Sequence, residues 1–355
     1  MKRQKEQGKR QKGGRAIRFA FCLLPFALSA AALADAARGS GSVGFVEITD
    51  QSRAAVDRGL KALAALQQPD GGWGGEGVGQ RHTGITALAT MAFMADGSLP
   101  DRGPYAQQVE RGLQHILASA QETGLVAGDA SHGPMYSHGF ATLMLGEIYG
   151  MTGDRRCREA LVKATRLIVT TQNSEGGWRY HPVPVEADIS VTICQVMALR
   201  SARNAGLSVP KATIDRAIAY VRECQNPGDG GFKYMRTSSG SAFPRSAAGV
   251  AALYYAGVYE DEALARGLDY LLRSHRSIQF NGGGHYFYGH YYAAQAMYLA
   301  GGDYWAQWFP RIRDELVGRQ NPDGTWASDH GDAYGTAMAL IILQVPNRLL
   351  PIFQR

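Results

Sequence analysis

The sequence predicts an all-α protein built from six helical hairpin repeats. Three observations predict it: a turn motif that occurs four times, helical patterns on both sides of each turn, and a polar position that recurs at near-constant spacing. The chain has 355 residues, of which 45% are hydrophobic and 19% charged, so it can bury a substantial core. The four turns are Gln67–Trp73, Gln172–Trp178, Gln225–Phe232 and Gln320–Trp326.

Each turn combines a Gln, a short run of Pro, Asp or Gly, and an aromatic residue. Pro lacks a backbone N–H and Gly admits positive φ, so these residues end a helix. A Gln at a helix end can bond free backbone groups, and the aromatic ring can cover the end of the next hairpin. We therefore expect structural roles for Gln67, Trp73, Gln172, Trp178, Gln225, Phe232, Gln320 and Trp326.

Helical patterns flank the turns. The segments before them alternate polar and apolar residues at helical spacing, as a half-exposed outer helix should. The segments after them are apolar or small almost throughout, which indicates a buried inner helix. The outer segments are Ala54–Leu66, Cys157–Thr171, Thr213–Cys224 and Trp308–Arg319, and the inner ones include Thr86–Phe93, Thr192–Leu199 and Thr336–Leu343.

One polar position recurs near the start of every inner helix. Successive occurrences are 52, 54, 54, 44 and 46 residues apart, which sets the number of repeats at six. Two repeats lack the full turn motif but share a Tyr-x-His element instead. Since one hairpin cannot bury its own apolar face, stability must come from stacking neighbours. The residues at this position are Thr86, His138, Thr192, Ser246, His290 and Thr336.

The Gln…Gly…Trp turns between paired helices resemble the squalene–hopene cyclase and protein prenyltransferase β-subunit superfamily. The resemblance covers roughly residues 50–345. It implies an α/α toroid, in which inner helices ring an apolar central cavity. It implies the fold and leaves the activity open, because one fold carries many functions.

The catalytic motifs of these families are degenerate here. Triterpene cyclases carry Asp-x-Asp-Asp-Thr-Ala, whose middle Asp protonates the substrate; the matching segment is Asp188–Ile193, with Ser190 at the donor position. A serine hydroxyl is too weak an acid to protonate an alkene. The prenyltransferase zinc elements resemble Tyr288–His290 and Asp332–Thr336, which retain at most one usable ligand, whereas catalytic zinc needs about three. We expect no cofactor and no metal.

Polar residues cluster where the inner helices begin, and a closed toroid would gather them at one end as a rim over an apolar barrel. Asp188 and Asp332 could equally be helix caps, and the Tyr-x-His pairs could be hydrogen-bonded couples in the core. A metal site from His290, His330 and Asp332 is chemically possible, though no spacing demands it. The candidate rim residues are His82, Tyr136, His138, Asp188, Ser190, Tyr288, His290, Asp332 and Tyr334.

The ends of the chain predict export. Residues 1–34 hold a basic stretch, an apolar run and a small-residue exit, typical of a signal peptide; 35–49 is expected to be a flexible lead-in and 346–355 an extended tail. The first 34 residues carry a charge of +7, so the remainder carries −1 and does not favour nucleic acid. After cleavage no stretch is long enough to span a membrane, and the protein would be periplasmic or extracellular.

Three function classes follow from these observations. The first is a toroid that binds a lipid-like molecule in its cavity or a protein partner at its rim, without cyclase or zinc chemistry. The second is an enzyme of isoprenoid metabolism with replaced catalytic groups. The third is a structural module of an envelope assembly. The three cysteines beyond the leader, Cys157, Cys194 and Cys224, are expected to be buried thiols.

Overall fold

The computed structural model describes residues 46–75, 82–128, 133–275, 278, 280 and 284–354. All of them belong to one compact unit, Phe45–Arg355. The other unit, Met1–Gly44, lies outside the described residues, and with it the predicted signal peptide and most of the predicted lead-in.

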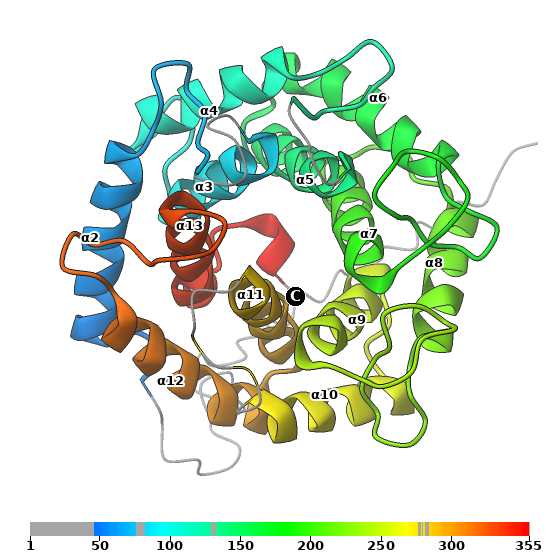
Figure 1. Ribbon diagram of the computed structural model, residues 1–355. Helices are drawn as coiled ribbons and strands as arrows, with labels where there is room; N and C mark the ends of the chain where they lie inside the picture. Colours follow the sequence, from blue (N-terminus) through cyan, green and yellow to red (C-terminus); the bar gives the residue numbers. More distant parts are fainter. Residues whose placement is uncertain are drawn as a thin grey trace, which may run out of the picture. The chain divides into compact units, whose positions relative to one another are not determined.

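The described residues form twelve α-helices in six hairpins, each an outer helix followed by an inner one (Figure 1). This confirms the predicted all-α toroid of six hairpins. The outer helices are α2 (Asp50–Ala65), α4 (Ala106–Ala118), α6 (Arg155–Thr170), α8 (Lys211–Glu223), α10 (Glu262–Ser274) and α12 (Gly302–Arg319). The inner helices are α3 (Thr83–Ala95), α5 (Met135–Thr152), α7 (Ile189–Asn204), α9 (Phe243–Ala256), α11 (Gly284–Ala300) and α13 (Asp332–Gln344).

The inner helices form a closed ring within this unit. Each packs against the inner helices of the two neighbouring hairpins, and α13 packs against α3, which joins the last hairpin to the first (Figure 1). Every residue of α3 is buried, whereas α4 buries only Val109, Gly112, Leu113 and Ile116. The apolar sequences therefore form the inner ring and the amphipathic ones the outer ring, as their patterns predict.

The Gln of each turn motif joins two hairpins. Its side-chain amide donates to a Gly carbonyl in its own turn and to a carbonyl near the start of the next outer helix; Gln172 bonds Gly176 at 2.8 Å and Thr213 at 2.9 Å. Gln320 bonds Ala55 in the same way, so the motif also closes the ring. The other two next-helix acceptors are Gln108, for Gln67, and Ala263, for Gln225.

The Trp of the motif joins a turn to the outer helix before it. The indole N–H of Trp178 donates to the carbonyl of Ile168 at 2.7 Å, and the ring is buried. Between the Gln and the Trp, Gly176 has a φ of +99°, and a Cβ there would lie 2.2 Å from the Arg216 carbonyl oxygen. Only glycine fits that close approach, which explains why the turn needs one. Trp73 and Trp326 make the same bond, to Leu63 and Leu316.

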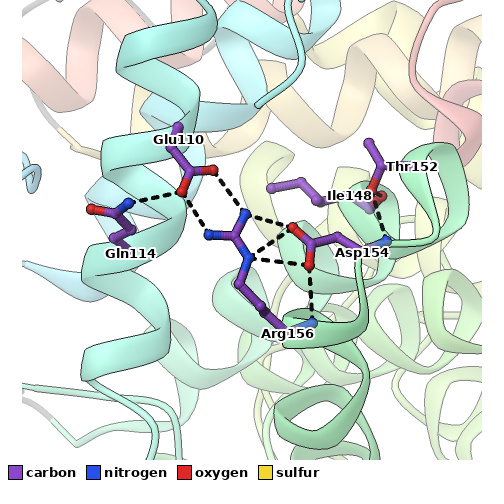
Figure 2. A network of polar contacts seen from close by, with 6 residues as sticks. All are labelled: Glu110, Gln114, Ile148, Thr152, Asp154 and Arg156. Carbon is purple, nitrogen blue, oxygen red and sulfur yellow. Dashed lines mark hydrogen bonds and ion pairs between the residues drawn. The ribbon is translucent and has the colours of Figure 1, made fainter. Parts of the chain in front are cut away.

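An ion-pair network links two outer helices (Figure 2). The guanidinium of Arg156, at the start of α6, bonds both carboxylate oxygens of Glu110 on α4, at 2.6 and 2.9 Å. It also bonds Asp154, the residue that caps α6.

Residues 46–49, the described part of the predicted lead-in, and the C-terminal tail both contact the toroid. The Glu47 carboxylate accepts a bond from the Trp305 indole, and Thr49 caps α2, so residues 46–49 are fixed. The tail forms two 3₁₀ turns, η2 (Val345–Asn347) and η3 (Pro351–Phe353), rather than an extended strand. Pro351 starts η3 and Pro346 is the second residue of η2, positions at which the fixed φ of Pro suits the start of a helix.

The cysteines Cys157, Cys194 and Cys224 are buried and unpaired, as predicted. Burial raises their thiol pKa values to about 12, 12 and 11. Among the described residues, none of the helices has the length and apolar character needed to cross a membrane.

Candidate functional site

The recurring polar position faces the turns and not the cavity. Thr192 accepts the backbone N–H of Trp178 through Oγ1 at 3.1 Å, and it is fully buried. Four other repeats make the same contact from inner helix to turn, so the position is structural. The pairs are Thr86 with Trp73, His138 with Val126, Ser246 with Phe232, and Thr336 with Trp326.

His138 is therefore a core residue, and its assignment to the cavity rim is wrong. Its Nδ1 accepts the N–H of Val126 at 3.1 Å, where other repeats use a hydroxyl. Burial lowers its pKa to about 4, so the ring stays neutral and can accept that bond. Val126 ends a reduced turn, Gln121–Val126, in which an aliphatic residue replaces the aromatic one, so this turn does not match the motif of the other four.

His290 is also buried in the wall and not at the rim. Its ring lies 4.5 Å from the Tyr286 ring, 5.0 Å from Phe243 and 5.9 Å from Trp308 of the outer helix α12. Burial lowers its pKa to about 3. The suggested metal set of His290, His330 and Asp332 does not assemble, since no metal-binding group of three His, Cys, Asp or Glu occurs in the described ranges.

The position two residues earlier faces the centre of the ring. The Tyr288 hydroxyl on α11 donates to the backbone carbonyl of Ser190 on α7 at 3.1 Å. Because α9 lies between these helices in the ring, the contact crosses the interior. Tyr136 and Ser190 are half-buried like Tyr288, and Tyr334 is 9% exposed. We name these four residues the mouth bowl: Tyr136, Ser190, Tyr288 and Tyr334.

A layer of aromatic side chains closes the barrel beneath the mouth bowl. Tyr291 on α11 meets Phe140 on α5 across the ring, with ring centres 6.0 Å apart. Tyr292 reaches Cys194 on α7, with its hydroxyl 3.2 Å from the sulfur. All four are at most 6% exposed, so this layer fills the interior of the ring next to the mouth bowl.

Asp188 is both a helix cap and a buried acid. Its Oδ1 accepts the N–H of Val191 at 2.8 Å, which confirms the capping role at the start of α7. Its side chain is fully buried, and Oδ2 has no hydrogen bond, with Arg179 Nε 4.0 Å away. Burial raises the pKa of Asp188 to about 6, despite the opposing effects of the Val191 hydrogen bond and of Arg179.

The two remaining candidates sit at helix starts. His82 caps α3, because its Nδ1 accepts the N–H of Ile85 at 3.3 Å. Asp332 does not cap α13: Gly331 is the cap residue, and Asp332 is the exposed first residue of the helix. A carboxylate there interacts favourably with the helix dipole. Neither residue belongs to the mouth bowl as defined above.

A second polar layer, which sequence reasoning missed, lies at the other end of the inner helices. Glu147 of α5 is fully buried; its Oε1 accepts the Ser201 hydroxyl at 2.6 Å and its Oε2 the Ile352 N–H at 2.9 Å. Nearby, Tyr255 donates to Gln295 at 2.6 Å. The sequence offered one sign of this layer: Glu147 is the single acidic residue in the otherwise apolar segment that forms α5.

These features define an α/α toroid with degenerate cyclase and prenyltransferase motifs. The model of the prenyltransferase alpha-alpha toroid domain matches residues 2–123 and 106–287. The chain belongs to this family.

Relatives and solved structures agree with this fold. The chain is 28% identical over 193 residues to a drimenyl diphosphate synthase of Streptomyces showdoensis, covering 54% of this chain and 34% of that protein. It therefore spans about a third of that relative's length. A variant of the type II terpene cyclase MstE from Scytonema, in complex with geranylgeranyl dihydroxybenzoate, superposes with a TM-score of 0.57 at 14% identity, covering 85% and 98% of the two chains. An α-1,6-mannanase of Salegentibacter sp. HEL1_6 superposes with a TM-score of 0.63 at 10% identity, covering 84% of this chain and 100% of the mannanase.

Proposed function

We propose that this chain is a binding toroid, which holds the apolar end of a lipid-like molecule in the mouth bowl. The observation that carries the proposal is the arrangement of side chains: the hydroxyl-bearing residues of the mouth bowl lie next to a buried aromatic layer inside the ring. Aromatic rings offer apolar contact area, and the rim hydroxyls suit a polar group at the end of the same molecule. Kinship with terpene cyclases favours an isoprenoid-like ligand.

Proton-initiated cyclisation is not part of the proposal. Ser190 occupies the place where the cyclase motif has its proton donor, and it lies in the mouth bowl. A hydroxyl there can donate a hydrogen bond but cannot protonate an alkene. Binding without that step is the chemistry that the residues of the bowl support.

Binding of farnesol, an isoprenoid alcohol, tests the proposal by isothermal calorimetry. Tyr136→Ala removes one wall of the bowl, so the affinity should fall by about tenfold. Tyr259→Ala is the matched control, because Tyr259 is 50% exposed and is not a bowl residue. Equal affinity of all three proteins, each with a native circular dichroism spectrum, or no binding to the wild type, would overturn the lipid-like assignment.

A second candidate function is catalysis by Asp188, and one observation favours it. This acid has a pKa near 6, an unbonded Oδ2, and a place two residues from the bowl residue Ser190. General acids work best when their pKa lies near the working pH. Asn caps helices as well as Asp does, so Asp188→Asn keeps the cap and removes the acid. Turnover of an isoprenoid diphosphate that Asp188→Asn abolishes without loss of stability supports catalysis; no turnover by the wild type rejects it.

We also propose that the protein is exported, on the strength of the leader at 1–34. Amino-terminal sequencing of the protein from its own host should begin at Asp35. A mature chain that begins at Met1 and stays with the cytosolic fraction would contradict export.

A further inference from the structure

A pocket of about 470 Å³ lies on the outer side of the toroid, apart from the mouth bowl. It is formed by helix α6, the connection between α7 and α8, and Tyr149 of α5. Its size falls within the range of small-molecule sites, roughly 300–1,000 Å³. The lining residues that matter for the argument are Arg158, Val162, Thr165, Arg166, Leu207 and Pro210.

The charges of α6 are neutralised on one side only. Arg156 pairs with Glu110 and Asp154, and Lys163 pairs with Glu122 and Glu159. Arg158 and Arg166 instead line the pocket, and in the described part of the chain neither guanidinium has an ion-pair partner.

No acidic residue lines the pocket, so its two arginines carry an uncompensated charge of +2. Arginines without carboxylate partners are suited to bind a carboxylate or phosphate group, which they contact through two N–H bonds.

The floor of the pocket is apolar, and a buried hydroxyl without a partner lies in its wall. Arg158, Val162, Thr165 and Arg166 are spaced three or four residues apart or adjacent, so they share one face of α6. Val162 is 40% exposed there, which is unusual for a large aliphatic residue in this chain. The Thr165 hydroxyl is buried and has no hydrogen-bond partner within the described ranges. The pocket thus combines an apolar surface with positive charge.

We propose that this pocket binds an amphipathic anion. The apolar part packs on Val162 and Leu207, and the anionic head pairs with Arg158 or Arg166. These two arginines are eight residues apart, about 12 Å along the helix axis, so a head group pairs with one while the chain extends toward the other.

Isothermal calorimetry on the full chain tests the proposal with three probes below their micelle concentrations: decanoate, decyl phosphate and decyl maltoside. The neutral maltoside shares the apolar chain and lacks the charge. The test variant is the double substitution Arg158→Gln and Arg166→Gln, and Arg155→Gln is the matched control. Arg155 is an exposed arginine of the same helix and does not line the pocket.

We expect at least one anion to bind the wild type and the Arg155→Gln control alike, and the double variant to bind about tenfold more weakly or worse. The anion that binds shows whether the site prefers a carboxylate or a phosphate head group. Val162→Asp places a carboxylate in the pocket and should also weaken binding. Equal affinity for decyl maltoside, undiminished binding by the double variant, or no saturable binding of either anion would overturn the proposal.

Discussion

The backbone N–H of Ile352 donates a hydrogen bond of 2.9 Å to Oε2 of Glu147. The bond joins the end of the chain to an inner helix, and η3 is drawn inside the inner ring in Figure 1. Ile352 and Phe353 are nearly fully buried against α5 and α7. Glu147 therefore anchors a C-terminal segment that fills the end of the barrel opposite the mouth bowl.

This anchor makes stability depend on pH. Burial raises the pKa of Glu147 from 4.5 to about 7, although the bonds from Ser201 and Ile352 oppose the shift. The folded state then binds more protons than the unfolded state between these values. The stabilisation is complete below pH 4.5 and is lost as the pH rises through 7, by on the order of 3 kcal/mol.

Urea unfolding of wild type and Glu147→Gln at pH 5 and pH 8 checks this sign. The wild type should lose stability relative to the variant on going to pH 8, since Gln has no charge to bury. Parallel pH dependence of the two proteins would show that Glu147 is not the group responsible.

The turn motif makes a second prediction. Trp178→Ala removes a buried ring and the indole bond to Ile168, and should cost about 3–5 kcal/mol in urea unfolding. Trp178→Phe keeps a ring but loses the bond, and should cost less, because Phe232 already occupies the same place in another repeat. If the two variants were equally unstable, the indole hydrogen bond and not the burial of the ring would be the main contribution of Trp178 to stability.

Ring closure makes a third prediction. Gln320→Ala removes the bonds to Ala55 and Gly324 and should destabilise the fold by about 1–3 kcal/mol. Amide hydrogen exchange should increase most in α2 and α12, which this residue joins. Gln172→Ala is the matched variant in the middle of the chain, and its exchange should increase in α6 and α8 instead. The same exchange pattern from both variants would contradict a local joining role.

The exposed ion pairs of Figure 2 should matter little. Arg156→Gln breaks the contacts with Glu110 and Asp154, all at the surface. Exposed pairs contribute about 0.2–1 kcal/mol, and salt screens them. The loss in the free energy of unfolding should be measurable at low salt and vanish near 1 M NaCl. A larger loss that persists in salt would show that Arg156 stabilises the fold by packing and not by its ion pairs.

The repeat pattern was sufficient to predict the fold. The motif residues at Gln172 and Trp178 make the contacts expected of a helix end and a turn, and the apolar segments became the inner ring. The limits of the pattern appear at Val126, where a small aliphatic residue replaces Trp and hides a repeat turn.

The candidate site was predicted only in part. The spacing of the repeats placed Tyr136, Ser190 and Tyr288 at equivalent positions. It could not tell which side of an inner helix faces the centre of the ring. His138 therefore looked like a rim residue, although a histidine can accept a backbone N–H as threonine does. Glu147 was missed because its partner, Ile352, is 205 residues away and lies in a tail without helical period.

Native mass spectrometry of the mature protein from its own host tests the central claim most directly. We predict a mass above that of chain 35–355. The excess should be a lipid-like molecule that is released on denaturation and is absent from the Tyr136→Ala and Tyr288→Ala double variant. A bare chain mass, or a bound molecule that the double variant retains, would contradict the assignment of the mouth bowl as a ligand site.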